Sequence, residues 1–212
     1  MAPNLLSKKT YLILIAISII LSLSIFSENS KKILIIGDSI SAGYGIPLND
    51  HWVHILQQDL DSKGQNIQLI NASVSGDTSG GGLSRIGKLL KDYSPDYILL
   101  ELGGNDGLRG YAIDKIKKNI ENICQIAIQE NIPVWIMQIK LPPNYGFRYT
   151  EAFKNIYIEI AKKKQITLIP FILDKIALDE DFMQPDGIHP NQKSQPKIAK
   201  IMYESIHPLI NK

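Results

Sequence analysis

Residues 33–45 read ILIIGDSISAGYG and decide the architecture of the chain. The first four residues form an unbroken apolar run that stops at Gly37, which is typical of a strand buried on both faces. Such strands occur in parallel sheets that helices cover on both sides. Asp38 and Ser39 then follow the carboxyl end of the strand, where open α/β sheets carry their functional groups.

The rest of the chain alternates strand and helix patterns. Four further short apolar runs are predicted as strands: residues 67–72, 97–102, 134–139 and 166–169. Apolar residues at three- and four-residue spacing predict helices within residues 52–60, 83–93, 113–127, 152–161 and 198–210. This alternation predicts a three-layer α/β/α sandwich around a mostly five-stranded parallel sheet.

Composition places the 212-residue chain among ordinary globular proteins, with 44% hydrophobic and 21% charged residues. Lys8 and Lys9 are the only charges before Glu28, so the formal net charge of +2 leaves zero for everything after residue 27. A near-neutral body lacks the positive field that nucleic acids attract, which argues against a nucleic-acid partner. The single cysteine, Cys124, excludes an internal disulfide, and its helical context predicts a buried small side chain.

Residues 1–27 are predicted to be an export signal, and residues 28–212 a single domain. Lys8 and Lys9 precede an uncharged stretch from Tyr11 to Phe26 that is dominated by Ile and Leu. This is the arrangement of a signal peptide, whereas a membrane crossing usually needs about 20 apolar residues. We therefore expect a periplasmic or secreted protein, with an uncleaved membrane anchor as the alternative.

The loops after the first three predicted strands carry polar residues and glycines. Gly37-Asp38-Ser39 follows the first strand, and its plain interpretation is a turn in which Asp38 or Ser39 caps a helix. Gly76 follows the second strand, where it either relaxes a turn or aims its backbone N–H at a ligand. Asn105 follows the third strand between glycines, which suits a turn but also a fixed amide donor for an oxyanion.

Near the C-terminus, Asp186 precedes His189 by three residues. The plain interpretation is a turn with a solvated carboxylate. In a tight loop the carboxylate can instead accept the Nδ1 hydrogen of the ring and present Nε2 as a base to a nucleophile. The four loops together are far more specific than any one of them.

Two other glycine motifs do not fit residues 37–45. Gly43-Tyr44-Gly45 lacks the third glycine of a dinucleotide-binding loop. Position 41 is serine, where the nucleophile elbow of α/β-hydrolases has glycine.

No cofactor or metal is predicted. His51 and His54 lie close in sequence, but no Cys, Asp or Glu cluster of matching spacing accompanies them, so a helix start is the favoured interpretation. Arg85, Lys88 and Lys91 are predicted to form a solvated helix face.

The ordered set of blocks resembles the SGNH hydrolases, which are also called GDSL hydrolases. The matching stretches are GDSISAGYG at 37–45, NASVSGDTS at 71–79, ELGGNDGLRG at 101–110, LPPNYGFRYTEAF at 141–153 and QPDGIHPN at 184–191. The resemblance covers about residues 31–210, and it implies a flavodoxin-like α/β/α fold and serine hydrolase chemistry.

The resemblance also implies roles for individual residues. Ser39 would be the nucleophile, His189 the general base and then acid, and Asp186 the group that orients His189. The backbone N–H groups of Ser39 and Gly76 and the side-chain amide of Asn105 would form the oxyanion hole.

Family relatives bind acyl chains between two loops that correspond here to residues 107–111 and 141–145. The candidate substrate contacts are Leu108, Tyr111, Leu141 and Pro142, and the alternative is that these side chains pack the loops against the body. Lys140 stands where close relatives are expected to have arginine. Lysine keeps the charge but not the bidentate geometry, so the substrate preferences that this loop determines in relatives do not carry over directly.

The expected function is therefore that of an exported serine esterase of acyl esters and thioesters, including lysophospholipids. We expect a monomer that acts on small-molecule substrates and makes transient contact with a membrane surface. The alternatives are a carbohydrate acetylesterase with the same site and a non-catalytic lipid-binding protein.

Overall fold

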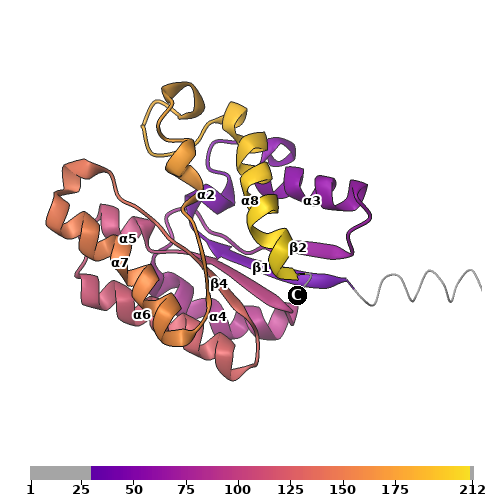
Figure 1. The fold of residues 1–212 in the computed structure, drawn as a ribbon, viewed down its shortest axis with the longest axis horizontal. Helices are drawn as coiled ribbons and strands as arrows, with labels where there is room; N and C mark the ends of the chain where they lie inside the picture. Colours follow the sequence, from indigo (N-terminus) through magenta and orange to yellow (C-terminus); the bar gives the residue numbers. More distant parts are fainter. Residues whose placement is uncertain (1–29, 211–212) are drawn as a thin grey trace, which may run out of the picture.

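The computed structural model describes residues 30–210 and contains one parallel sheet with the strand order β2-β1-β3-β4-β5 (Figure 1). The strands are β1 (Lys31–Gly37), β2 (Ile67–Asn71), β3 (Tyr97–Glu101), β4 (Val134–Met137) and β5 (Thr167–Ile169). All five predicted strands are confirmed, and the boundaries differ by one or two residues.

Helices connect the strands. The longer ones are α3 (Trp52–Ser62), α4 (Ser79–Tyr93), α6 (Ile113–Gln129), α7 (Phe147–Lys164) and α8 (Gln195–Ile210). Two short helices, α2 (Ser39–Ala42) and α5 (Gly104–Leu108), follow β1 and β3 directly. Short 3₁₀ turns complete the connections at Leu48–Asp50, Pro143–Tyr145, Ile172–Lys175, Glu180–Phe182 and Gln192–Ser194.

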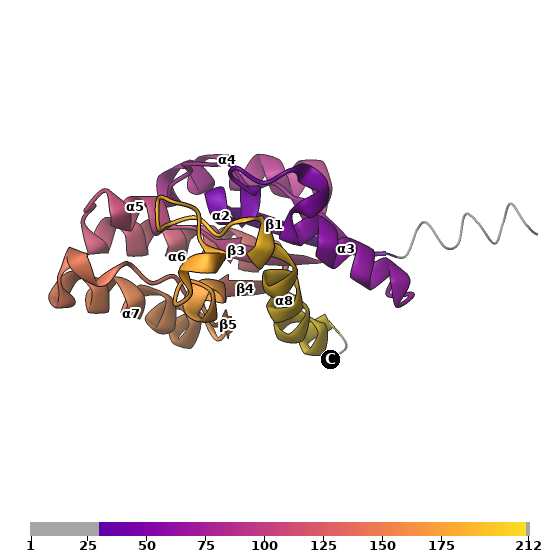
Figure 2. The same ribbon diagram turned by 90° about the horizontal axis from the view of Figure 1, so that it is seen from above.

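The helices form a layer on each face of the sheet (Figures 1 and 2). Helices α4, α6 and α7 pack on one face, and α3 and α8 pack on the other. The predicted three-layer α/β/α sandwich with a five-stranded parallel sheet is therefore confirmed.

Strand β1 shows why its sequence is an unbroken apolar run. Leu34 and Ile36 face the core beneath α4 and α6, whereas Ile33 and Ile35 face the core beneath α3 and α8. Each of the four is at most 1% exposed. Burial of both faces removes the alternation of polar and apolar residues that a half-exposed strand would show.

The strand order places the polar loops together. From β1 the chain moves outward to β2, and then returns to the opposite side of β1 to form β3. Such a reversal leaves a crevice outside the carboxyl ends of the strands on either side of it. Gly37 and Glu101 are level in the pairing of β1 with β3, so the loops that begin at Asp38 and Leu102 start side by side.

Cys124 is fully buried on α6, and burial raises the pKa of its thiol to about 12. The prediction of a buried small side chain is confirmed.

The predicted export signal lies outside the described residues, as do both ends of the predicted domain, at 28–29 and 211–212. Within residues 30–210, no helix combines the length and apolar character that a membrane crossing requires.

Candidate active site

Three polar side chains form a chain of hydrogen bonds at the carboxyl ends of the strands. The hydroxyl Oγ of Ser39 lies 2.8 Å from Nε2 of His189. The other ring nitrogen, Nδ1, lies 2.6 Å from Oδ2 of Asp186. Ser39 and His189 are 150 positions apart in sequence, and the sheet topology brings their loops together.

Asp186 is held as a carboxylate. Partial burial acts to raise its pKa, but hydrogen bonds from the backbone and ring of His189 and from the backbone of Ile188 outweigh burial and lower the pKa to about 2. A carboxylate only accepts hydrogen bonds, so Nδ1 of His189 carries the hydrogen. Nε2 is then the acceptor for the Ser39 hydroxyl, which is the arrangement a general base needs.

The loop after β1 presents Ser39 at the start of a short helix. Asp38 is the N-cap of α2, and its Oδ1 accepts the backbone N–H of Ile40 at 3.2 Å, as the plain interpretation of the motif predicts. Because Ser39 is the first helical residue, its own N–H has no acceptor within the helix. That N–H is available to an anionic oxygen.

The predicted oxyanion donors lie on the three connections that follow β1, β2 and β3, with Ser39 in α2 and Asn105 in α5. The Asn105 amide donates to Oδ2 of Asp38 at 3.3 Å, which links the loop after β3 to the loop after β1. Gly76 has a φ of +79°, a conformation that residues with a Cβ rarely adopt. The N–H of Val74 donates to the carbonyl of Gly37 at 3.1 Å, which ties the loop of Gly76 to the end of β1.

The buried carboxyl group of Glu101 contacts the loop that carries Ser39. Glu101 is the last residue of β3 and is 1% exposed, and its Oε2 accepts the backbone N–H of Asp38 at 3.3 Å. Burial and the neighbouring Asp38 raise the pKa of Glu101 well above its usual range. Burial also raises the pKa of Asp38 to about 6, against the lowering effect of Ile40, His189 and Asn105. Burial therefore favours the neutral, protonated form of Glu101 over its carboxylate.

Two residues that the sequence did not single out fix the loops. Asp106 is 2% exposed and accepts both the N–H and the hydroxyl of Ser79, at 2.7 and 2.6 Å. Asn119 on α6 donates to the same hydroxyl at 3.0 Å. The loops that carry Gly76 and Asn105 are therefore joined through a buried network.

The prediction of a solvated face for Arg85, Lys88 and Lys91 is wrong for Arg85. Its guanidinium turns back from α4, donates from Nε to Oδ2 of Asp77 at 2.9 Å and also donates to the carbonyl of Ala72. Asp77 in turn accepts the backbone N–H of Thr78 at 2.8 Å. An arginine can satisfy carbonyls and a carboxylate at once, so burying it here stabilises the loop that leads to Gly76.

A family model described as "GDSL-like Lipase/Acylhydrolase family" matches residues 35–195. The chain belongs to this family. The match spans the loops of Ser39, Gly76, Asn105 and His189. The predicted resemblance to the SGNH, or GDSL, hydrolases is confirmed.

Relatives with established names agree with the family. The chain is 44% identical over 182 residues to the "Thioesterase 1/protease 1/lysophospholipase L1" of Escherichia coli strain K12, which is 86% of each chain. It is 39% identical over 193 residues to the "Arylesterase" of Vibrio mimicus, which is 91% of this chain and 96% of that protein. This protein is therefore a hydrolase of esters.

A solved structure shows the same fold. The psychrotrophic esterase EstA from Pseudoalteromonas sp., inhibited by monoethylphosphonate, matches with a TM-score of 0.84 and 42% identity. The match covers 86% of this chain and 100% of EstA.

The two loops expected to border the substrate lie side by side in this hydrolase. The hydroxyl of Tyr145 donates to the carbonyl of Leu108 at 3.0 Å, and that of Tyr149 donates to the carbonyl of Tyr111 at 2.7 Å. Leu141 packs against Gly107, where an added Cβ would lie 2.7 Å from a Leu141 methyl group. Leu141 thus packs against the first residue of the other loop, and its role as a substrate contact stays a prediction.

The remaining candidate contacts differ in exposure. Leu108 and Pro142 are half-buried, and Tyr111 is exposed. A pocket of about 490 Å³ lies beside them at the start of α7. Its lining residues are Ile113, Tyr145, Gly146, Phe147, Arg148, Tyr149 and Ala152. Lys140 pairs with Asp174, so its charge is directed at the body of the protein.

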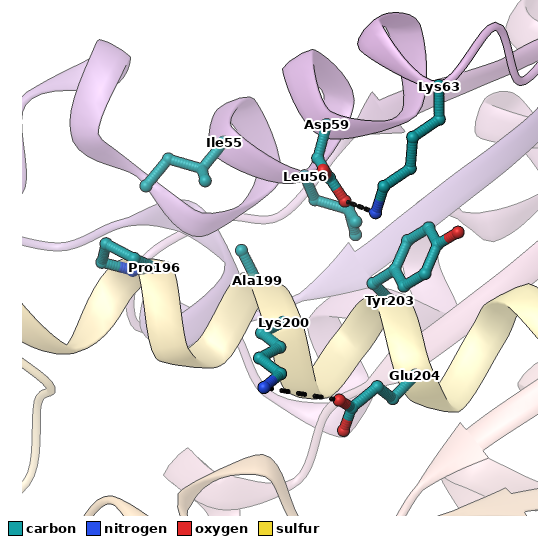
Figure 3. Close-up of a pocket in the computed structure, with 9 residues that line it drawn as sticks. All are labelled: Ile55, Leu56, Asp59, Lys63, Pro196, Ala199, Lys200, Tyr203 and Glu204. Carbon is teal, nitrogen blue, oxygen red and sulfur yellow. Dashed lines mark hydrogen bonds and ion pairs between the residues drawn. The ribbon is translucent and has the colours of Figure 1, made fainter.

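A second pocket of about 470 Å³ lies between α3 and α8 (Figure 3). It takes no residue from the loops of Ser39, Asn105 or His189. Lys63 pairs with Asp59 at 2.6 Å and lies 3.7 Å from the centre of the Tyr203 ring. Because its charged side chains pair with one another, this pocket offers a ligand little net charge.

Proposed function

We propose that this protein is an exported serine esterase in which Ser39 is the nucleophile, His189 the general base and Asp186 the residue that orients the base. The observation that carries the proposal is the hydrogen-bonded chain from Ser39 Oγ to His189 Nε2 and from Nδ1 to the ionised Asp186. A serine hydroxyl is a weak nucleophile until a base takes its proton, and His189 lies at the right distance to do so.

The reaction proceeds in two halves. His189 Nε2 takes the proton of Ser39 as Oγ attacks the substrate carbonyl carbon, and the carbonyl oxygen becomes anionic. The N–H groups of Ser39 and Gly76 and the amide of Asn105 donate to that oxygen. His189 then gives its proton to the leaving alcohol or thiol, and Ser39 remains acylated. Water, deprotonated by His189, then attacks the acyl carbon. His189 returns that proton to Oγ as the bond between the acyl carbon and Oγ breaks, which releases the acid and free Ser39.

The substrates proposed are acyl esters and thioesters, with lysophospholipids among them. Relatives at about 40% identity carry the names arylesterase and thioesterase 1/protease 1/lysophospholipase L1. The candidate contacts for the acyl chain are Leu108, Tyr111, Leu141 and Pro142, on the two loops that follow β3 and β4. The packing of Leu141 on Gly107 holds the two loops against each other.

Contact with a lipid surface is supported by where exposed apolar side chains lie. Nine large hydrophobic residues are exposed within residues 30–210. Seven of them lie on the segments that run from the carboxyl end of a strand up to and including the first residue of the next long helix. These seven are Tyr44, Leu48, Val74, Tyr111, Phe147, Leu178 and Ile188. They therefore gather at the end of the molecule that holds Ser39, where an aggregated lipid substrate would approach.

Export is proposed from the sequence of residues 8–26, in which two lysines precede an uncharged apolar stretch. Expression of the full chain, separation of the periplasm and sequencing of the new N-terminus would test it. An intact N-terminus in the membrane fraction would instead favour the anchor.

The catalytic proposal is tested by fluorophosphonate labelling of the purified protein, with Ser39→Ala as the matched variant. Labelling of the native protein alone is expected, with ester hydrolysis lost and the melting temperature nearly unchanged. A labelled or active Ser39→Ala variant would contradict the assignment. A chain-length series of p-nitrophenyl esters separates the substrate classes, since a rate maximum at acetyl would favour the carbohydrate acetylesterase.

A further inference from the structure

The ring of Tyr44 lies against the ring of His189. The two ring centres are 4.6 Å apart and the ring planes are tilted by 39°. Both nitrogens of His189 already contact Ser39 and Asp186, so the face of the imidazole is what remains for other groups to contact. Among the hydrogen bonds of residues 30–210, none involves the Tyr44 hydroxyl, and the ring is the part of Tyr44 that meets His189.

The backbone of Tyr44 is fixed from both sides. Its N–H donates to the carbonyl of Ser39 at 3.0 Å, and its carbonyl accepts from Nε2 of Gln184 at 2.8 Å. Gln184 also donates through Nε2 to the carbonyl of Pro190 at 3.1 Å and through its backbone N–H to the carbonyl of His189 at 2.7 Å. One side chain thus joins the loop of Tyr44 to the loop of His189.

Glycines on either side of Tyr44 make this arrangement possible. Gly43 and Gly45 have φ values of +75° and +74°, which residues with a Cβ rarely adopt. An added Cβ on Gly45 would lie 2.9 Å from Oε1 of Gln184. The close approach of the two loops therefore depends on the local sequence around Tyr44.

We propose that Tyr44 is a positioning residue, whose ring face holds the imidazole of His189 in line with Ser39 and stabilises the positive charge that His189 gains during the reaction. The two in-plane hydrogen bonds of His189 fix the positions of its nitrogens but resist a tilt about the line between them only weakly. A ring packed on the face resists that tilt. An aromatic face also attracts a cation, so it favours the imidazolium over the neutral ring.

The inference rests on the proposed function, because it assumes that His189 is the base. The carboxylates that act on the ring are Asp186 in its own loop and Asp38 at the start of α2. Both remain in every Tyr44 variant. A difference between the variants in the pH dependence of the rate therefore reports the loss of the aromatic ring.

The experiment compares Tyr44→Phe and Tyr44→Ala with the native protein in p-nitrophenyl ester hydrolysis across pH. Tyr44→Ala is expected to lower kcat roughly five- to tenfold, with KM within about twofold, and to shift the acidic limb of kcat/KM to lower pH. Tyr44→Phe keeps the ring and should restore the rate to within about twofold and the limb to its native position. Tyr93→Ala, which removes an exposed ring at the end of α4, is the control and should change neither.

Three results would overturn the proposal. A Tyr44→Ala variant with native kcat and a native limb would show that the ring does nothing for His189. Equal losses in Tyr44→Phe and Tyr44→Ala would assign the effect to the hydroxyl, and a loss confined to KM would make Tyr44 a substrate contact. Failure of the proposed function is recognised separately. A His189→Ala variant with native kcat would show that His189 is not the base.

Discussion

The carboxylate of Asp106 accepts the backbone N–H and the hydroxyl of Ser79 together, at 2.7 and 2.6 Å. Asp106 lies on α5, next to Asn105, and Ser79 begins α4, three residues after Gly76. Two donors of the proposed oxyanion hole are thus held relative to one another by the buried side chain of Asp106.

Replacing Asp106 with alanine should both destabilise the folded protein and lower its kcat. The change leaves the Ser79 N–H and hydroxyl buried without their acceptor, which costs about 3 kcal/mol in the free energy of unfolding. Because the loops of Gly76 and Asn105 lose this buried link, kcat should fall more than KM rises. Urea unfolding and steady-state kinetics would measure the two effects. Asp106→Asn keeps an acceptor oxygen and should lose less in both, and equal losses in the two variants would contradict the explanation.

Asn105→Ala should lower kcat by about 100-fold or more, with a smaller change in KM. The amide is proposed to bind the oxyanion more strongly than the ground-state carbonyl, so its loss affects the transition state most. Steady-state kinetics on a p-nitrophenyl ester would measure it. An effect on KM alone would make Asn105 a substrate-binding residue instead.

Glu101→Gln should make the protein more stable at high pH. Burial raises the pKa of both Glu101 and Asp38, so the folded state binds protons more tightly than the unfolded state does. The stability that these two groups contribute is fully present below their unfolded pKa values near pH 4, and it is lost as pH rises through about 6 for Asp38 and through the raised pKa of Glu101. Glutamine keeps an acceptor for the Asp38 N–H and cannot ionise.

Thermal melting at several pH values tests this effect. The melting temperature of Glu101→Gln relative to the native protein should rise between pH 5 and pH 8. Glu151→Gln, which alters a half-exposed glutamate paired with Lys154, is the matched control and should show no such trend. A constant difference across pH would mean that Glu101 is already ionised in the folded protein.

Local sequence patterns predict the sheet well, because each strand depends on neighbouring residues, and the loop of Asp186 and His189 is equally local. The apolar run 33–36 is buried on both faces, and Asp186 lies close enough to His189 in sequence for its carboxylate to accept the His189 N–H within one turn. The short helix α5 was not predicted, since Gly103 to Gly107 is equally typical of a turn. Asp106 favours the helix over the turn here through its bond to Ser79, which is 27 positions away in sequence.

The contacts that tune the site could not be predicted for the same reason. Arg85 looked like part of a solvated face, and only the path of the loop from Ala72 to Asp77 supplies its acceptors. Glu101 ends an apolar strand and has no local partner, and its neighbour Asp38 is 63 positions away. Tyr44 and His189 meet through two loops that Gln184 joins. A single sequence contains these residues but not their pairing.

Replacing Asp186 with asparagine tests the relation between the carboxylate and the base. The pKa of about 2 keeps Asp186 ionised across the working pH range, so protonation of Asp186 is not the expected cause of a fall in kcat/KM on acidification. A nearby negative charge favours the protonated ring, so its removal should move the acidic limb to lower pH.

The plateau rate should fall as well, by up to about 10⁴-fold, because the asparagine amide can donate to Nδ1 and hold the ring in the wrong tautomer. Asp174→Asn, which changes a carboxylate paired with Lys140 outside the site, is the control and should alter neither the plateau nor the limb. Both changes are required in Asp186→Asn, since a lost plateau with an unmoved limb would mean that the variant only misfolds the loop. If neither changed, a different carboxylate would have to orient His189, and the 2.6 Å contact between Asp186 and Nδ1 would have no part in the reaction.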